Sequence, residues 1–152
     1  MTTKHILFLV ESYLPGFKSG GPVKTVYSAV KVLKKKGFDC TVVCNDRDLG
    51  DINRYENIKD GVNYISHTKV IYLRRGLLGY IKLLTMLCSK KNNFFHLNSY
   101  FSFKFSIFPR GVLWLIRSRK KVVLAPRGEL SAAALTLKSA KKSYLIWLMS
   151  LI

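Results

Sequence analysis

The sequence predicts an α/β fold with a Rossmann-like, doubly wound and mainly parallel sheet. Short, continuous apolar runs alternate along the chain with segments whose apolar residues recur at helical spacing. Runs such as residues 6–10 lack the polar alternation of a half-exposed strand, so they are typical of strands buried on both faces of a parallel sheet. Because crossovers between parallel strands are right-handed, this alternation predicts helices on both faces of the sheet. A length of 152 residues suits a single domain.

The predicted elements follow one another with short polar connections. A strand at 6–10 leads into a Gly-rich loop at 11–21 and then into a helix with apolar residues at 23, 26, 27, 30 and 33. Pro22 fits the first turn of this helix, where its missing N–H costs nothing, and Gly37 can end it. Further strands are expected at 41–44, 62–65, 70–73, 94–97 and 122–125, and further helices at 77–88, 109–118 and 133–151.

Charge and cysteine usage narrow the class of protein. The formal net charge is +18, and Glu129 is the one acid among residues 61–152. Such a field attracts phosphorylated substrates, nucleic acid or an anionic membrane surface. The aromatic residues do not interleave with Lys and Arg as a nucleic-acid stacking platform requires, so no nucleic-acid partner is expected. A basic nucleic-acid-binding or membrane-surface scaffold domain without catalysis remains the alternative.

The three cysteines indicate neither a disulfide framework nor a zinc site, because their number is odd and no Cys-x-x-Cys occurs. Cys40 and Cys44 fall in or beside an apolar strand and are predicted to be buried thiols. The sequence shows no signal peptide and no membrane-spanning segment. A cytoplasmic protein is therefore predicted, one that can attach peripherally to the inner face of the membrane.

Candidate site residues follow the predicted strands, because open α/β sheets bind ligands outside the carboxyl ends of their strands. Gly20 and Gly21 stand before a helix N-terminus, where backbone N–H groups can hold a phosphate or a sugar hydroxyl; a plain flexible turn is the alternative. His96 lies in the strand at 94–97, and its imidazole could act as a base or contact a sugar, or simply be a satisfied core residue. Asn98 and Ser99 follow that strand.

Two further groups come after other strands. Arg127, Gly128 and Glu129 follow the strand at 122–125; Arg127 could clamp a phosphate or carboxylate, and Glu129 could contact a ligand or cap the next helix. Asp46 and Asp48 form an Asp-x-Asp sequence, which holds a metal in some sugar transferases. A structural or acceptor-contact role for these two acids is favoured, and no metal is predicted.

Four short stretches in this order resemble the N-terminal half of GT-B fold glycosyltransferases, specifically glycosyltransferase family 4. They are residues 20–23 (GGPV), 45–51 (NDRDLGD), 96–102 (HLNSYFS) and 125–131 (APRGELS), and the resemblance covers nearly the whole chain. It implies that residues 1–152 form the acceptor-binding Rossmann-like domain of a retaining enzyme. A second domain, carrying a Glu-x7-Glu motif that this chain lacks, would bind the nucleotide-sugar co-substrate.

The resemblance also assigns roles to individual residues. It implies that Gly20 and Gly21 lie near the donor phosphates, that His96 makes an active-site contact as the catalytic residue, and that Arg127 stands in the cleft wall. Many family members have His-x-His where this chain has His96 and Asn98. The implied reaction builds surface polysaccharide or lipopolysaccharide on a saccharide or lipid-linked acceptor, without metal or cofactor. The apolar end at 144–152 predicts truncation, with the donor domain missing and the remaining half inactive alone.

Overall fold

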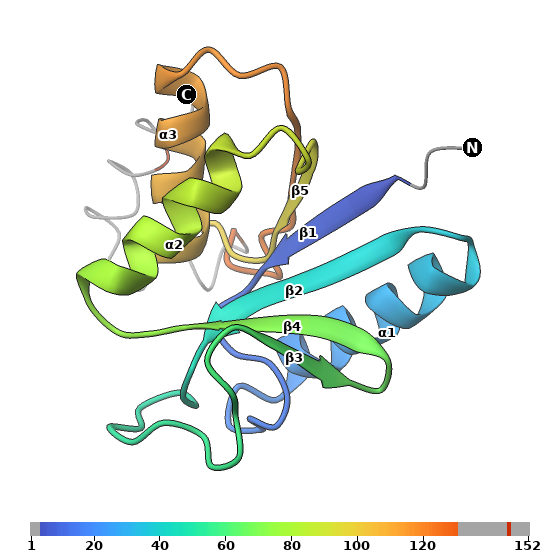
Figure 1. The fold of residues 1–152 in the computed structure, drawn as a ribbon, viewed down its shortest axis with the longest axis vertical. Helices are drawn as coiled ribbons and strands as arrows, with labels where there is room; N and C mark the ends of the chain where they lie inside the picture. Colours follow the sequence, from blue (N-terminus) through green and yellow to red (C-terminus); the bar gives the residue numbers. More distant parts are fainter. Residues whose placement is uncertain (1–3, 131–145, 147–152) are drawn as a thin grey trace.

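The computed structural model describes residues 4–130 and residue 146. Its centre is a six-stranded sheet in the order β3-β4-β2-β1-β5-β6 (Figure 1). β3 runs antiparallel to β4, and every other neighbouring pair is parallel. The strands are β1 (His5–Leu9), β2 (Asp39–Asn45), β3 (Val62–Ile65), β4 (Thr68–Leu73), β5 (Phe94–Leu97) and β6 (Lys121–Leu124).

Helices cover both faces of this sheet. α1 (Gly21–Lys35) packs on one face, while α2 (Leu77–Cys88), a π-helical turn η1 (Phe103–Ile107) and α3 (Phe108–Leu115) pack on the other (Figure 1). Successive side chains of a strand point to opposite faces, so Phe8 joins the core under α1 and Leu7 joins the core under α2 and α3. The α/β class and the mostly parallel sheet flanked by helices are thus confirmed, and the architecture is compatible with a Rossmann-like fold.

Most predicted elements form where the pattern placed them, with ends shifted by a few residues. The strand predicted at 41–44 extends to Asp39–Asn45, and both short strands between residues 62 and 73 are present. Cys40 and Cys44 are buried, and burial raises the pKa of the Cys40 thiol to about 11 and raises that of Cys44 as well. The predicted helix at 133–151 and the apolar end of the chain lie outside the described residues.

Two expectations were wrong in detail. The segment before α3 was not predicted to be helical, yet η1 continues directly into α3, which starts at Phe108 and ends at Leu115 rather than at residue 118. The last strand was predicted to be buried, but β6 is the edge of the described sheet, and Val122 and Val123 are 37% and 42% exposed. An edge strand has a neighbour on one side alone, so its apolar run is only partly covered.

The order of the strands fixes where a ligand can enter. The chain passes from β1 through α1 to β2 on one side, and later from β4 through α2 to β5 on the other side of β1. The helices after β1 and β5 therefore leave toward opposite faces, which opens a crevice at the carboxyl ends of these two strands. Among the described residues, no helix is long and apolar enough to cross a membrane.

Candidate functional site

A pocket of about 160 Å³ lies at the crevice between β1 and β5, and we call it the switch-point pocket. Its polar lining comes from Glu11, Ser12 and Ser19 after β1, Asn98 and Ser99 after β5, and Arg127 and Glu129 after β6. Pro22 and Val26 of α1 close one side. The structure thus brings together four of the predicted site residues, from segments about 30 positions apart, because parallel strands end at the same edge.

Both carboxylates of the pocket belong to one hydrogen-bonded network. Ser99 Oγ donates to Glu129 Oε1 at 2.8 Å, and the Tyr100 N–H donates to the other oxygen of Glu129. Ser99 Oγ accepts from the Ser102 N–H at 3.1 Å, and Ser102 Oγ donates to Glu11 Oε1 at 2.7 Å. Glu129 therefore ties the loop after β6 to the loop after β5, and Ser102 ties η1 to the end of β1.

Arg127 extends this network toward β5. Its guanidinium donates to Asn98 Oδ1, and the Asn98 amide nitrogen lies 3.1 Å from His96 Nδ1. The Nε of Arg127 is buried and has no hydrogen-bond partner among the described residues. Its backbone has φ +51°, a conformation that is rare for a residue other than glycine and that costs of the order of 1 kcal/mol. A strained backbone at a residue that lines a pocket and whose side chain keeps an unpaired polar atom is characteristic of a binding residue.

His96 sits behind Asn98 and does not line the switch-point pocket. Its ring stacks on Phe8 with the centroids 4.8 Å apart. Burial lowers the pKa of His96 below its ordinary value, and the Arg127 guanidinium lowers it further. Because an amide nitrogen can only donate, Nδ1 accepts and the proton of the neutral ring is on Nε2. This geometry orients Asn98; a direct catalytic role for His96 stays a prediction.

The predicted glycines border the pocket without lining it. Gly20 precedes α1 with φ +57°, and a Cβ on Gly20 or Gly21 would meet no atom within 4 Å. No side chain caps this helix, so its first N–H groups stay open toward the end of β1. Gly128 also has a positive φ of +82° and forms the turn that places Arg127 and Glu129 side by side in the pocket wall.

Glu11 and Ser12 also line an adjacent pocket of about 450 Å³ between the ends of β1, β2 and β4. Here Asp46 is held by Arg47 and Arg54, each with Nε 2.9 Å from a carboxylate oxygen. Burial alone would raise the pKa of Asp48, but backbone N–H donors from Lys18, Leu49 and Phe17 outweigh it and hold the pKa below its usual value.

The ion pairs of Asp46 and the hydrogen bonds of Asp48 indicate structural roles for both side chains in the described part of the chain. Asp46 is neutralised by two guanidiniums, and Asp48 fixes the Gly-rich loop after β1 through its backbone donors. Among the described residues, no group of three or more His, Cys, Asp or Glu side chains is arranged to hold a metal.

Several residues of this region were not among the predicted site residues, and Ser12 and Ser19 of the pocket lining are two of them. Glu11 and Ser102 form the network described above, and Lys104 of η1 lines the adjacent pocket, where its amine donates to Asn45 Oδ1 at 2.9 Å. Burial lowers the pKa of Lys104, although Asp46 opposes this shift. Glu11 could have been included from its position directly after β1, whereas the unpredicted η1 concealed Ser102 and Lys104.

The switch-point pocket can recognise hydroxyl groups. Glu11 is exposed and keeps one carboxylate oxygen free of the described hydrogen bonds, and the side chains of Arg127 and Asn98 bring N–H donors to the same lining. A sugar hydroxyl donates and accepts at once, so acceptors and donors placed side by side suit it. A phosphate would meet a lining with two carboxylates and a single guanidinium, and like charges in contact cost several kcal/mol.

Comparison with known proteins assigns no family to the chain. No protein-family model matches the chain, and neither a curated protein nor a solved structure matches it.

Proposed function

We propose that this chain is the acceptor-side half of a retaining glycosyltransferase of the GT-B type, and that the switch-point pocket binds one sugar ring of the acceptor. The composition of the pocket carries the proposal. A carboxylate, a hydroxyl, an amide and a guanidinium from two of the four resembling stretches, residues 96–102 and 125–131, line a single hollow together with Glu11, Ser12 and Ser19 of the loop after β1, and Pro22 of a third stretch closes one side. The fourth stretch, residues 45–51, lines the adjacent pocket, which shares Glu11 and Ser12 with the first.

The size and charge of the pocket support a sugar rather than the donor's phosphates. Its volume of about 160 Å³ is below the roughly 300–1,000 Å³ typical of pockets for drug-sized ligands, which suits a single ring. The adjacent pocket then offers room for the next residue of a saccharide chain. The nucleotide sugar would bind mainly to a second domain facing this edge, and no metal or other cofactor is invoked.

The reaction would then proceed between the two domains of a cytoplasmic enzyme. The acceptor is a saccharide, free or lipid-linked, of the kind used to build surface polysaccharide or lipopolysaccharide. Glu11 and Arg127 hold its hydroxyls, Asn98 positions the Arg127 guanidinium, and His96 positions Asn98. Binding at fixed orientation is the contribution of this half, since holding two reactants in line removes much of the entropic barrier to transfer.

Sugar binding can be measured on the chain as it is. Titration of the ¹⁵N-labelled protein with simple methyl glycosides at millimolar concentration should shift the amide resonances of Asn98, Ser99 and Glu129. Inorganic phosphate should leave them in place. Glu11→Gln should weaken glycoside binding by about tenfold, because it removes a hydrogen bond to a charged group. Glu56→Gln, the same change in an exposed loop at the same edge, is the control.

Shifts of these amides by phosphate but by no glycoside would contradict the sugar assignment. The transferase assignment is tested separately, by reading the coding DNA beyond Ile152 for a domain with Glu-x7-Glu. The joined protein should turn over a nucleotide sugar, and Glu11→Gln should reduce that turnover. Turnover by residues 1–152 alone would show that the two-domain mechanism is wrong.

A further inference from the structure

The acids of the molecule gather at one edge of the sheet, where cations accompany them, and the opposite edge is almost purely basic. Segments 4–5, 31–39, 66–69, 89–93 and 116–121 lie at the amino ends of the parallel strands, where the helices end. We call this surface the basic edge. Asp39 is its one acid, against Lys4, Lys31, Lys34, Lys35, Lys36, Lys69, Lys90, Lys91, Arg117, Arg119, Lys120 and Lys121. The remaining acids stand at the carboxyl ends of the strands or in the loop at 46–61 and after β6.

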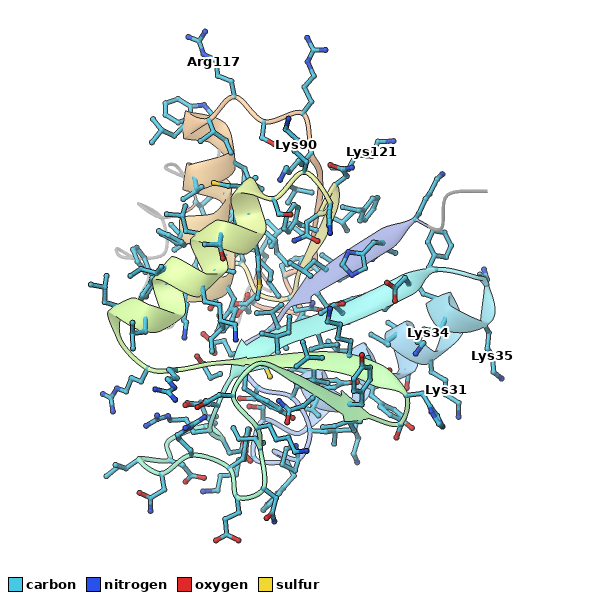
Figure 2. The ribbon with its side chains drawn as sticks, in the orientation of Figure 1. Lys31, Lys34, Lys35, Lys90, Arg117 and Lys121 are labelled. Carbon is cyan, nitrogen blue, oxygen red and sulfur yellow. The ribbon has the colours of Figure 1, made fainter. Side chains whose placement is uncertain are left out.

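Most cations of the basic edge are available to a partner. Figure 2 shows Lys90, Arg117 and Lys121 on one side of the amino end of β1, and Lys31, Lys34 and Lys35 on the other side. Lys34 donates to the His67 carbonyl, and Lys120 donates to the carbonyls of Leu87 and Ser89. Within the part of the chain that the structure describes, Lys35, Lys90 and Lys121 are exposed and make no side-chain hydrogen bond or ion pair.

Apolar side chains stand at the same edge. α3 runs antiparallel to the strands, so its end comes to the amino side, and the chain leaves it through Ile116 into Arg117. There Trp114, Leu115 and Ile116 are 58%, 74% and 46% exposed. Trp114 and Leu115 line a hollow whose wall also contains Arg117 and Lys120. Trp and aliphatic residues beside cations are the combination that enters the interface of a lipid bilayer.

We propose that the basic edge docks on an anionic lipid surface, with Trp114, Leu115 and Ile116 entering the headgroup region. Lysines and arginines near such a surface each add to the attraction, and the exposed apolar residues add burial. A single nucleic-acid strand would instead need several aromatic faces along a basic groove. The described segments of this edge and the last turn of α3 contain one exposed aromatic residue, Trp114, and Tyr64 of β3 is exposed opposite Lys69.

This docking fixes the orientation of the switch-point pocket. The pocket lies at the carboxyl ends of the strands and therefore at the edge of the sheet opposite the one that contacts the lipid. β2 has 7 residues, which at roughly 3.3 Å each separate the two edges by about 23 Å. If the proposed function holds, the acceptor is either a lipid-linked glycan long enough to extend from the membrane to the pocket, or an acceptor that is released from the membrane. It is not the first sugar attached to the lipid.

Vesicle co-flotation tests the docking. The protein should bind vesicles of phosphatidylcholine with 30% phosphatidylglycerol, bind pure phosphatidylcholine weakly, and dissociate as salt shortens the screening length. The triple variant Lys35→Glu, Lys90→Glu, Lys121→Glu should bind the anionic vesicles about a hundredfold more weakly, at roughly fivefold for each lost cation. The matched control, Lys24→Glu, Lys59→Glu, Arg75→Glu, makes the same charge change near the other edge and should bind at least tenfold more tightly than the first variant.

Equal loss in both triple variants would overturn the proposal, because it would show attraction by net charge without a docking face. So would tight binding to an oligonucleotide by a protein that does not bind the anionic vesicles. Nitroxide-labelled lipid in bicelles checks the orientation: it should broaden the amides of Lys90 and Arg117 and spare those of Ser99 and Glu129. The reverse pattern would overturn the orientation. Glycoside titration without lipid tests the sugar pocket independently, so either proposal can fail alone.

Discussion

The two carboxylates of the switch-point pocket differ in how far the fold already uses them. Glu129 accepts from Ser99 Oγ and from the Tyr100 N–H, whereas Glu11 is exposed and accepts from Ser102. Glu129→Gln would set an amide N–H₂ against one of these donors and should lower the free energy of unfolding by about 1–3 kcal/mol. Glu11→Gln should cost less than about 1 kcal/mol, so urea denaturation separates the two. Equal losses would contradict the network described above.

The imidazole of His96 makes stability depend on pH. Burial and Arg127 lower its pKa in the folded protein, while in the unfolded chain it titrates near its ordinary value of about 6.5. Between the folded-state and the unfolded-state pKa of His96, the unfolded chain binds more protons than the folded protein. The contribution of His96 to the free energy of unfolding is therefore fully present above about pH 6.5, and it falls as the pH falls, by at most about 1.4 kcal/mol per pH unit. Unfolding free energies at pH 7.5 and 5.0 should differ less in His96→Gln than in the parent. An unchanged difference would show that His96 does not carry this dependence.

Individual site residues were predictable where they follow strands. Asn98, Ser99, Arg127 and Glu129 were chosen because strand carboxyl ends converge, and all of them line the pocket. The bond between Ser102 and Glu11 joins positions 91 apart, and no local pattern indicates such a pair. The partnership of His96 and Asn98 likewise depends on rotamers, which the spacing of residues does not specify.

At the level of elements, the turn into α1 contains a testable contrast between neighbouring glycines. Gly20 has φ +57° and ψ −107°, a conformation that side chains disfavour, whereas Gly21 has no positive φ and is the first residue of α1. Both positions are open, so sterics do not separate them. Gly20→Ala should destabilise the protein by about 1–3 kcal/mol. Gly21→Ala should be neutral or slightly stabilising, because alanine loses less backbone entropy on folding.

Thermal unfolding of both variants measures this contrast. A larger loss in Gly21→Ala than in Gly20→Ala would be inconsistent with the turn described here. The same samples should report on the site, because the α1 terminus borders the switch-point pocket through Pro22 and Val26. Weaker glycoside binding in Gly20→Ala is therefore expected along with the lost stability.

The spacing of hydrophobic residues predicted most helices and strands, but it failed at η1 and at β6 for physical reasons. The π-helical η1 has no simple sequence period: Phe103 at its start is exposed, and the three consecutive residues Phe105, Ser106 and Ile107 are buried. β6 has the apolar run of a buried strand, but burial of a strand depends on which strands flank it. That information is carried by the topology and not by the run itself.

The fold of the whole molecule shows where the charges lie, which the net charge alone does not indicate. The sequence gives +18, which predicts attraction to anions in general, but the distribution follows from strand order and from where each helix ends. The lysine-rich end of α1 and the connections before β5 and β6 meet at one edge because β1, β2, β5 and β6 are parallel, so each of these strands begins at the same edge. The site at one edge and the almost purely basic surface at the other are thus a consequence of the fold.

Two binding surfaces at opposite edges should act independently. Effects of substitutions more than about 7–10 Å apart, without shared partners, add within roughly 0.5 kcal/mol, and no described hydrogen bond links Glu11 to Lys121. The double variant Glu11→Gln, Lys121→Glu should therefore lose glycoside affinity as Glu11→Gln does and vesicle affinity as Lys121→Glu does. Saturating glycoside should leave the vesicle affinity unchanged, and by linkage the converse holds. Vesicle co-flotation with and without glycoside measures this; a change of more than about threefold would show that the sheet transmits binding from one edge to the other.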